Sequence, residues 1–287
     1  HLTAINDNII RVEASPEDVI PIKKSLIIVP QKIRPSDVKT SENETSITMK
    51  TRNVKAVVNK QTGKIIFYDM KGNVLLQEAN NGKTFKNIQV DGTKGYSWRA
   101  LFDSPEDEAF YGLGQHQASE YNYKGKNEEL FQYNTKVSIP FIMSNKNNGL
   151  LWDSYSLCRF GNPNDYMQLN SAFTLYDKDG RLGGLTGTYE SADGKKLVRT
   201  EDSLYFENSS VISNLPQNIR MNDTKVTYEG FLEAPVTNNY RFILYYAGYV
   251  KVFLDGKLVV PERWRTAWNP NAWKFTLPMT KGQKSSL

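Results

Sequence analysis

Residues 240–260 read YRFILYYAGYVKVFLDGKLVV, and this stretch decides the fold class. Every second residue of its first part is apolar or aromatic, and this set is Tyr240, Phe242, Leu244 and Tyr246. Because successive side chains of a strand point to opposite faces of a sheet, the alternation predicts a strand with one strongly apolar face. The dipeptide Asp255-Gly256 then separates VKVFL from KLVV with the residues that a two-residue hairpin turn favours. The stretch therefore predicts antiparallel strands.

The same organisation is found in the N-terminal third of the chain. Turn residues such as those at 61–63 and 71–73 separate short apolar runs, which are IIRVEA, SLIIV, SITMKT, VKAVVN, KIIFYD and NVLLQE. This spacing predicts antiparallel hairpins. Helix-length amphipathic periods are lacking, and the best helical candidate is a short turn at residues 104–107. We therefore expect an all-β protein.

Length and a local change in composition predict the domains. The chain has 287 residues, which exceeds the roughly 100–200 residues of a typical single domain. Residues 159–170 read RFGNPNDYMQLN, in which Gly161, Pro163 and the asparagines favour a loop over a strand. We predict two β-sandwich domains, at residues 1–170 and 171–287.

Charge and composition bear on the partners. The net charge is +5, but lysines and arginines are scattered and never more than two stand together. Without a basic patch or a recognisable motif, we expect no nucleic-acid partner. No apolar stretch approaches the roughly 18 residues that cross a bilayer, so no transmembrane segment is expected. The single Cys158 cannot form an intrachain disulfide, which fits a cytoplasmic protein or an exported bacterial protein without bridges.

Two further stretches carry a family resemblance. Residues 110–117 read FYGLGQHQ, and residues 130–153 read LFQYNTKVSIPFIMSNKNNGLLWD. Together they resemble the non-catalytic N-terminal β-sandwich of glycoside hydrolase family 31. The glycines that flank Leu113 permit backbone conformations closed to other residues, so we expect the strand to bend and to present residues 115–117 from a loop. The alternative is a buried polar corner that holds the sandwich together.

The second half of the chain resembles a different module. LTGTY at residues 185–189, VTYEGFLEAP at residues 226–235 and the stretch at residues 238–260 resemble the protective-antigen-type β-sandwich, a carbohydrate-associated module. In some bacterial α-xylosidases of family 31 this module is inserted within the N-terminal region, and the two resemblances occur here in that order. The resemblance implies that the catalytic barrel of the same polypeptide is missing here and that the second module is incomplete at its C-terminus.

The resemblance also implies an activity for the parent protein. It implies a retaining α-xylosidase that acts on xyloglucan-type oligosaccharides, with an aspartate nucleophile and an aspartate acid/base in the missing barrel and without a cofactor. The present chain would shape and extend the substrate site. An α-glucosidase of the same family and a stand-alone carbohydrate-binding or adhesin protein are the alternatives. We expect export in a bacterium, to the periplasm or the cell surface.

The residues of this chain argue against catalysis by the chain itself. Glycoside hydrolysis needs two carboxylates about 5–5.5 Å apart for retention or about 6.5–9.5 Å apart for inversion. The densest acidic clusters, at residues 106–108 and 128–129, are expected to be solvated loops. His116 is the only internal histidine, and Gly112-Leu113-Gly114 lacks the rest of a dinucleotide-binding loop. We expect no catalytic residue, metal or cofactor in this chain.

Residues that bind sugar are the better candidates. By the resemblance, Asn134 and Thr135 occupy the position where family 31 sandwiches send a loop toward the active-site mouth. Their amide and hydroxyl groups can bond sugar hydroxyls while Tyr133 offers a ring face, and a capped β-turn is the alternative. In the second module, three rings punctuate ERWRTAWNPNAWKF, namely Trp264, Trp268 and Trp273. Aromatic rings stack on sugars, although such residues more often lie in a core.

Overall fold

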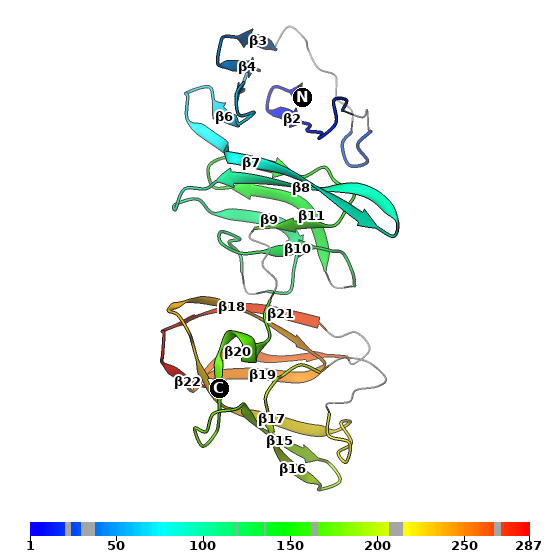
Figure 1. Cartoon of the computed structure of the whole chain (residues 1–287), viewed down its shortest axis with the longest axis vertical. Coiled ribbons are helices and arrows are strands. Elements are labelled where there is room, and N and C mark those ends of the chain that lie inside the picture. The colour runs from blue at the N-terminus through cyan, green and yellow to red at the C-terminus, as the bar shows by residue number, and fades with distance from the viewer. Residues whose placement is uncertain are drawn as a thin grey trace. The chain divides into compact units, whose positions relative to one another are not determined.

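The computed structural model describes residues 1–20, 24–29, 38–118, 120–134, 136–161, 166–206, 215–266 and 271–287 (Figure 1). Strands dominate these residues, which confirms the all-β prediction. Contacts divide the chain into two compact units. The first unit comprises His1–Gln115 and Asn122–Asn162, and the second comprises His116–Tyr121 and Pro163–Leu287. The domain limits predicted at residues 170 and 171 stay a prediction.

One sheet of the first unit is built from hairpins in chain order. Its strands are β3 (Lys39–Glu42), β4 (Ser46–Lys50), β5 (Val54–Asn59), β6 (Ile65–Asp69), β7 (Val74–Val90) and β8 (Thr93–Asp103). Neighbours in that order pair antiparallel, and β1 (Leu2–Asn6) pairs with β2 (Ile9–Val12) separately. Gly63 and Gly72 adopt positive φ of 68° and 91° in the predicted turns. The hairpins predicted from these turns are thus confirmed.

The SLIIV run at residues 25–29 forms no strand, and the prediction is wrong there. The buried hydroxyl of Ser25 donates a hydrogen bond to Asp153, and it accepts hydrogen bonds from the amides of Ile27 and Ile28. A serine that bonds its own backbone offers the chain an alternative to strand pairing. The local hydrogen bonds therefore prevail over the apolar pattern.

A second sheet of the first unit has the order β12-β11-β9. Its strands are β9 (Phe110–Gln115), β11 (Val137–Ser144) and β12 (Asn148–Leu151), and β10 (Glu128–Leu130) pairs with β13 (Cys158–Phe160) nearby in the chain. Figure 1 shows β7 and β8 lying over this sheet. Trp98 of β8 stacks on Trp152 with ring centroids 4.3 Å apart, so the two layers pack together.

Strand β9 bends at the Gly-Leu-Gly segment as predicted. The φ angle is 127° at Gly112, 65° at Leu113 and 98° at Gly114. The register with β11 shifts at the same place, between Ser138 and Ile142. Leu113 is 2% exposed and lies in the core of this unit, so the bend turns its side chain inward.

The segment after the bend belongs to the second unit. Residues 116 and 117 lie outside strands, as predicted, whereas Gln115 still belongs to β9 and pairs with Val137, so the loop begins one residue later than predicted. Ala118 then forms a parallel bridge with Lys274. Glu120 pairs with Arg241 at 3.2 Å, and both side chains are largely buried.

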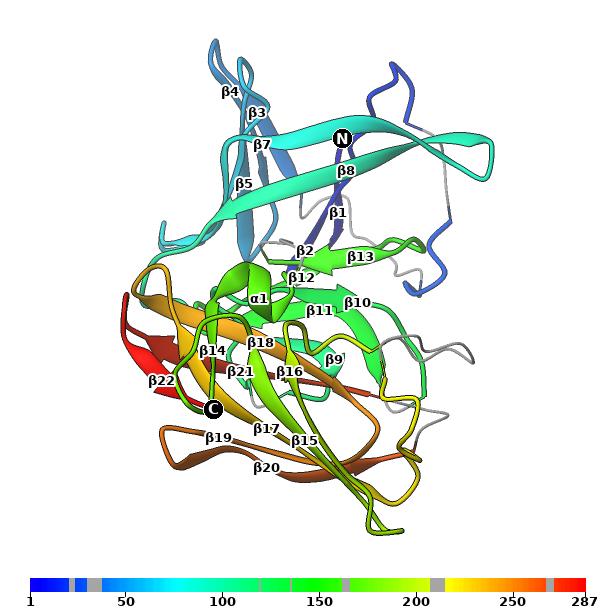
Figure 2. The same cartoon turned by 60° about the horizontal axis from the view of Figure 1, so that its bottom comes forward.

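The second unit contains a larger sheet and two antiparallel pairs (Figure 2). The sheet comprises β14 (Thr174–Asp177), β15 (Leu185–Ser191), β16 (Lys196–Glu201), β17 (Thr224–Glu233) and β22 (Lys284–Ser286). The pairs are β18 (Asn238–Tyr246) with β21 (Asn271–Met279), and β19 (Gly248–Leu254) with β20 (Lys257–Arg265). The short helix α1 (Leu169–Ala172) precedes β14. Strand β17 connects the sheet, since it pairs with β15 first and then with β14 and β22.

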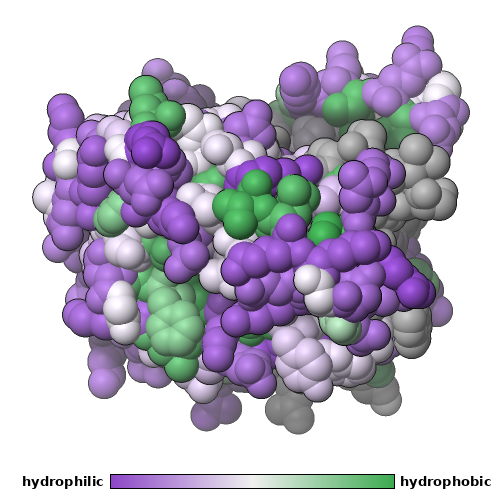
Figure 3. Space-filling model, turned by 90° about the horizontal axis from the view of Figure 1, so that it is seen from below, coloured by the Kyte–Doolittle hydropathy of each residue, from purple (hydrophilic) through white to green (hydrophobic). Residues whose placement is uncertain are grey.

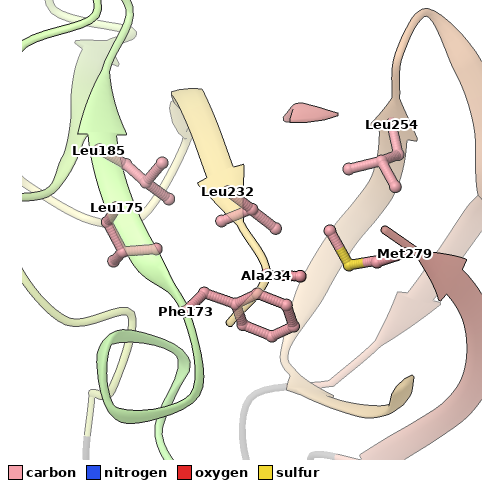
Figure 4. Packing of buried hydrophobic residues seen from close by; sticks show 7 residues of the cluster. All are labelled: Phe173, Leu175, Leu185, Leu232, Ala234, Leu254 and Met279. Atoms are coloured by element: carbon pink, nitrogen blue, oxygen red, sulfur yellow. The ribbon is translucent and has the colours of Figure 1, made fainter. Parts of the chain in front are cut away.

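The core of the second unit lies among these strands. Figure 4 shows its buried members converging from several strands, and they are Phe173, Leu175, Leu185, Leu232, Ala234, Leu254 and Met279. Tyr240 and Phe242 pack against this cluster, whereas Ile243 and Tyr245 are 39% and 65% exposed. The predicted apolar face of residues 240–246 is therefore confirmed.

The hairpin turn predicted at Asp255-Gly256 is also present. Both residues adopt positive φ, of 49° and 73°, which is the conformation that a type I′ turn requires. Within the described ranges no helix is both long and apolar enough to cross a membrane.

Candidate functional site

The acidic clusters are partly buried, which corrects their prediction as solvated loops. Glu108 and Glu128 are 5% and 2% exposed, whereas their neighbours Glu106 and Glu129 face solvent. Buried carboxylates require a partner because the desolvated charge is costly. Glu108 accepts a hydrogen bond from Ser144. These carboxylates are therefore structural groups, and composition alone did not show which member of each cluster is buried.

Glu128 anchors the loop that carries the first predicted contacts. Its Oε1 lies 3.2 Å from Nζ of Lys136, whose side chain is 11% exposed. The same ammonium donates to the carbonyl of Glu129 at 2.7 Å. Because both side chains are largely buried, removing either one would leave an uncompensated buried charge. The ion pair therefore stabilises the conformation of this loop.

The loop itself closes as a turn in front of this pair. The amide of Lys136 donates to the carbonyl of Tyr133 at 2.9 Å, and Asn134 lies exposed in the turn. Tyr133 is 38% exposed, and its ring centroid lies 6.0 Å from that of Phe131. Thr135 lies outside the described residues. The structure thus places Tyr133 and Asn134 together on the surface, on a loop held by a buried ion pair.

The two predicted tryptophans that the structure describes differ in their exposure. Trp264 is 54% exposed on β20, and its ring lies 6.4 Å from that of Tyr249. Trp273 on β21 is partly buried, and the guanidinium carbon of Arg263 lies 3.0 Å from its ring centroid. Trp268 lies outside the described residues. Of the two candidate tryptophans that lie in the described ranges, Trp264 is the one that offers an open ring to a ligand.

The contact of Arg263 with Trp273 is a cation–π interaction. Partial burial of the guanidinium lowers the pKa of Arg263 from its ordinary value. The arginine occupies one face of the ring, so stacking of a sugar on that face is blocked. Trp273 is better explained as part of the packing than as a sugar contact.

Sequence reasoning missed Tyr249 as a surface ring. Tyr249 is 75% exposed and lies opposite Trp264 in the hairpin. The sequence contained a signal for it. In a strand at residues 249–254, the side chains of Tyr249, Lys251 and Phe253 share one face, because successive side chains point to opposite faces. Both faces of this strand carry apolar or aromatic residues, so composition alone did not show which of them is exposed.

Hydropathy does not reveal this surface. Figure 3 shows one face of the molecule, where hydrophobic residues gather in separate patches among hydrophilic ones. Tyrosine and tryptophan carry polar groups at the edge of an apolar ring, so they rank as intermediate on a hydropathy scale although their ring faces bind apolar surfaces. The exposed fractions of Tyr249 and Trp264 and their pairing across the hairpin identify this surface better than hydropathy does.

The described part of the chain holds no group of three His, Cys, Asp or Glu residues that fits a metal ion. Glu201, which is 5% exposed, accepts a hydrogen bond from Arg199 Nε at 2.6 Å and another from the hydroxyl of Tyr189. Burial raises the pKa of Tyr228, which lies beside this group. The network is satisfied and lies between strands. The surface groups can bind hydroxyls and ring faces, which is recognition chemistry.

Comparison with known families gives a match over the first unit. The family described as glycosyl hydrolase 31 N-terminal galactose mutarotase-like domain matches residues 1–160. This range is more than half of the 287 residues.

Named relatives agree with this match. An α-xylosidase of Saccharolobus solfataricus is 32% identical over 162 residues, which are 53% of this chain and 22% of the relative. An uncharacterized family 31 glucosidase of Pseudescherichia vulneris is 27% identical over 150 residues, which are 45% of this chain and 28% of the relative.

A solved structure matches both units. The family 31 α-xylosidase of Xanthomonas citri is 35% identical with a TM-score of 0.86, covering 99% of this chain and 31% of the solved chain. The chain thus spans less than a third of the length of each of these relatives.

Proposed function

The chain belongs to glycoside hydrolase family 31 through its N-terminal galactose mutarotase-like domain, and from this we propose that it is the non-catalytic N-terminal part of a retaining α-xylosidase. The proposed substrates are xyloglucan-type oligosaccharides. The observation that carries the proposal is the likeness to the Xanthomonas citri α-xylosidase over 99% of the chain at 35% identity. The Saccharolobus relative bears the same activity in its name.

In this proposal the chain shapes the substrate site, and a catalytic barrel elsewhere in the parent polypeptide supplies both carboxylates. The buried carboxylates described above support this division of labour. Glu108, Glu128 and Glu201 are each bound to a hydroxyl, an ammonium or a guanidinium of the same unit. A nucleophile or general acid must instead face the scissile bond with a partner across it.

We further propose that the second unit is a protective-antigen-type module that serves carbohydrate binding. Its support is the sequence resemblance at residues 185–189, 226–235 and 238–260 together with the sheet arrangement of β14 to β22. The fold positions exposed rings on a stable sheet, as a sugar-binding module requires.

The substrate of the parent protein can be tested directly. The polypeptide encoded by the whole reading frame should release xylose from aryl α-xyloside and from xyloglucan oligosaccharides, with retention of configuration. The measurement is product identification with anomeric analysis by NMR. Release of glucose from aryl α-glucoside at a higher kcat/KM would favour the α-glucosidase alternative, which the Pseudescherichia relative's name suggests. A reading frame that ends near residue 287 would favour a stand-alone carbohydrate-binding protein.

Within the site, Tyr133 and Asn134 are proposed to meet the leaving-group side of the substrate. A loop from a flanking sandwich can border the mouth of a barrel but not readily its floor, where the transferred sugar sits. The turn is exposed, and the buried Glu128–Lys136 pair holds it in place. Thr135 belongs to the same proposal through the sequence alone.

Replacing Asn134 by alanine in the parent enzyme tests this placement. A lost hydrogen bond to a neutral hydroxyl costs about 0.5–1.5 kcal/mol, so kcat/KM on a xyloglucan oligosaccharide should fall about two- to tenfold. Activity on a small aryl α-xyloside should stay nearly unchanged, because that substrate does not reach the loop. Equal losses on both substrates would place Asn134 in the structure or in the glycone pocket instead.

Localisation is a separate proposal. We propose that the parent protein is exported to the periplasm or the cell surface of a bacterium. The single Cys158 leaves folding independent of intrachain disulfides, which is compatible with either side of the membrane. Cell fractionation with an antibody against this chain tests it, and recovery in the cytoplasm only would contradict it.

A further inference from the structure

An exposed face lies on the hairpin formed by β19 and β20. Along β19, Tyr249 is 75% exposed and Phe253 45% exposed, whereas Leu254 is 8% exposed. Across the hairpin, Trp264 pairs with Tyr249 and Leu258 with Phe253, and these partners are 54% and 52% exposed. We call Tyr249, Phe253, Leu258 and Trp264 the outer face. Figure 2 shows β19 and β20 side by side along the lower edge of the second unit, next to the β15–β16 hairpin.

The hairpin holds the outer face rigidly. On its inner side Leu254 and Val260 are 8% and 0% exposed, and Leu254 belongs to the core cluster of Figure 4. The register shifts twice along the pair, between Val250 and Val252 and again before Phe253. Such bulges re-aim side chains. They keep the two exposed pairs on the same side of the hairpin.

The rings of Tyr249 and Trp264 form the largest part of this face. Their centroids are 6.4 Å apart and their planes meet at 50°, so the two rings do not cover one another as a parallel stack would. Each ring therefore keeps area for a ligand. The phenol hydroxyl and the indole N–H lie at the ring edges, where they can bond a polar group of a ligand that rests on the ring.

The exposed charges of the hairpin balance. Lys251 lies two residues from Tyr249 and Glu262 two residues from Trp264, and both side chains are exposed. Lys251 Nζ is 5.9 Å from the ring centroid of Phe253. The exposed charged residues of the hairpin are Lys251, Lys257, Asp255 and Glu262, two of each sign, so they carry no net charge that would select an ionic polymer. The centre of a protein interface is typically depleted of charged residues, which this face is not.

We propose that the outer face binds a neutral polysaccharide, with pyranose rings stacked on Tyr249 and Trp264. The C–H face of a pyranose packs on an aromatic ring, while its equatorial hydroxyls reach the hydrogen-bonding groups at the edges. Lys251 and Glu262 are exposed two residues from Tyr249 and Trp264, and each carries a hydrogen-bonding group. The inference deepens the proposed function and rests on it, because a carbohydrate-active parent encounters such polymers.

Affinity electrophoresis of the 287-residue chain tests the proposal. Gels contain xyloglucan, hydroxyethylcellulose or dextran, and migration is compared with a gel lacking polymer. We expect retardation by at least one polymer. The variants Tyr249→Ala and Trp264→Ala should each lower the association constant about three- to tenfold, since each removes one stacking ring. Both positions are exposed, and circular dichroism of each variant checks that the fold is kept.

The matched control is Tyr245→Ala. Tyr245 is 65% exposed on β18, which is paired with β21 and not with the hairpin. Its removal should leave the association constant unchanged. The proposal is overturned if no polymer retards the chain, or if Tyr245→Ala loses as much binding as the hairpin variants. It is also overturned if the hairpin variants abolish self-association in sedimentation while leaving gel mobility unchanged, which would make a second copy the ligand.

Failure of this inference is distinguishable from failure of the proposed function. If no polymer retards the chain, the parent can still release xylose. If the parent releases no xylose, the polymer can still retard this chain, and Tyr249→Ala can still weaken that retardation.

Discussion

Single residues decide how strand β9 runs. Three consecutive residues, Gly112, Leu113 and Gly114, have positive φ, and such angles are strained for side chains other than glycine. The two glycines made this bend predictable from sequence. The inward position of Leu113 was not predictable, because it follows from the register with β11 rather than from local preference.

Substitution of Gly114 by alanine should destabilise the first unit. The new Cβ would lie 2.1 Å from the carbonyl oxygen of Val137, and the backbone φ of 98° is unfavourable as well. We expect a loss of about 2–4 kcal/mol in the free energy of unfolding, measured by urea denaturation.

Gly63→Ala is the matched control for that variant. Gly63 has φ of 68° but no atom within 4 Å of an added Cβ, so only the backbone term applies. We expect about 1 kcal/mol there. Equal losses for the two variants would show that close packing at Gly114 does not matter.

Other residues show where prediction stops. Glu106 and Glu108 belong to one acidic cluster, yet only Glu108 is buried. Trp264 and Trp273 belong to one aromatic run, yet only Trp264 is exposed. In both cases the outcome depends on strands that are distant in sequence, and a linear pattern does not contain that information.

At the scale of elements, hairpins were predictable and isolated apolar runs were not. Turn chemistry and alternation together predicted β5, β6, β19 and β20, because both signals describe the same hairpin. The SLIIV run had apolar residues without a turn partner, and side-chain hydrogen bonds of Ser25 hold it in another conformation. An apolar run needs a pairing partner to become a strand.

The turn of the β19–β20 hairpin also holds the C-terminal strand. Asp255 donates its amide to the carbonyl of Ser286 at 2.8 Å, and its Oδ1 accepts the amide of Ser286 at 2.7 Å. Asp255→Ala removes the carboxylate acceptor and puts alanine at φ 49°, so β22 should open more often. A loss of about 1–2 kcal/mol is expected, seen as faster hydrogen exchange at residues 284–287.

Asp255→Asn is the control, because asparagine keeps an acceptor and tolerates positive φ. Exchange in β22 should then stay close to that of the unchanged chain. Fast exchange in both variants would mean that the charge of Asp255, and not its geometry, holds the strand.

At the scale of the molecule, two sequence resemblances suggested the architecture, and a family match over residues 1–160 established the identity of the first unit. The all-β class followed from local patterns. The activity of the parent did not follow from this chain, since the groups that perform glycoside hydrolysis are a carboxylate pair set across one bond. The chain also spans only 31% of the solved α-xylosidase that it resembles.

The most direct test of the account compares the 287-residue chain with the whole parent polypeptide on aryl α-xyloside. The account predicts turnover by the parent and none by the chain above a blank purified in parallel, because the buried carboxylates of this chain are bound to structural partners. Turnover by the chain that disappears on replacing one of its own acidic residues, such as Glu128→Gln, would contradict it.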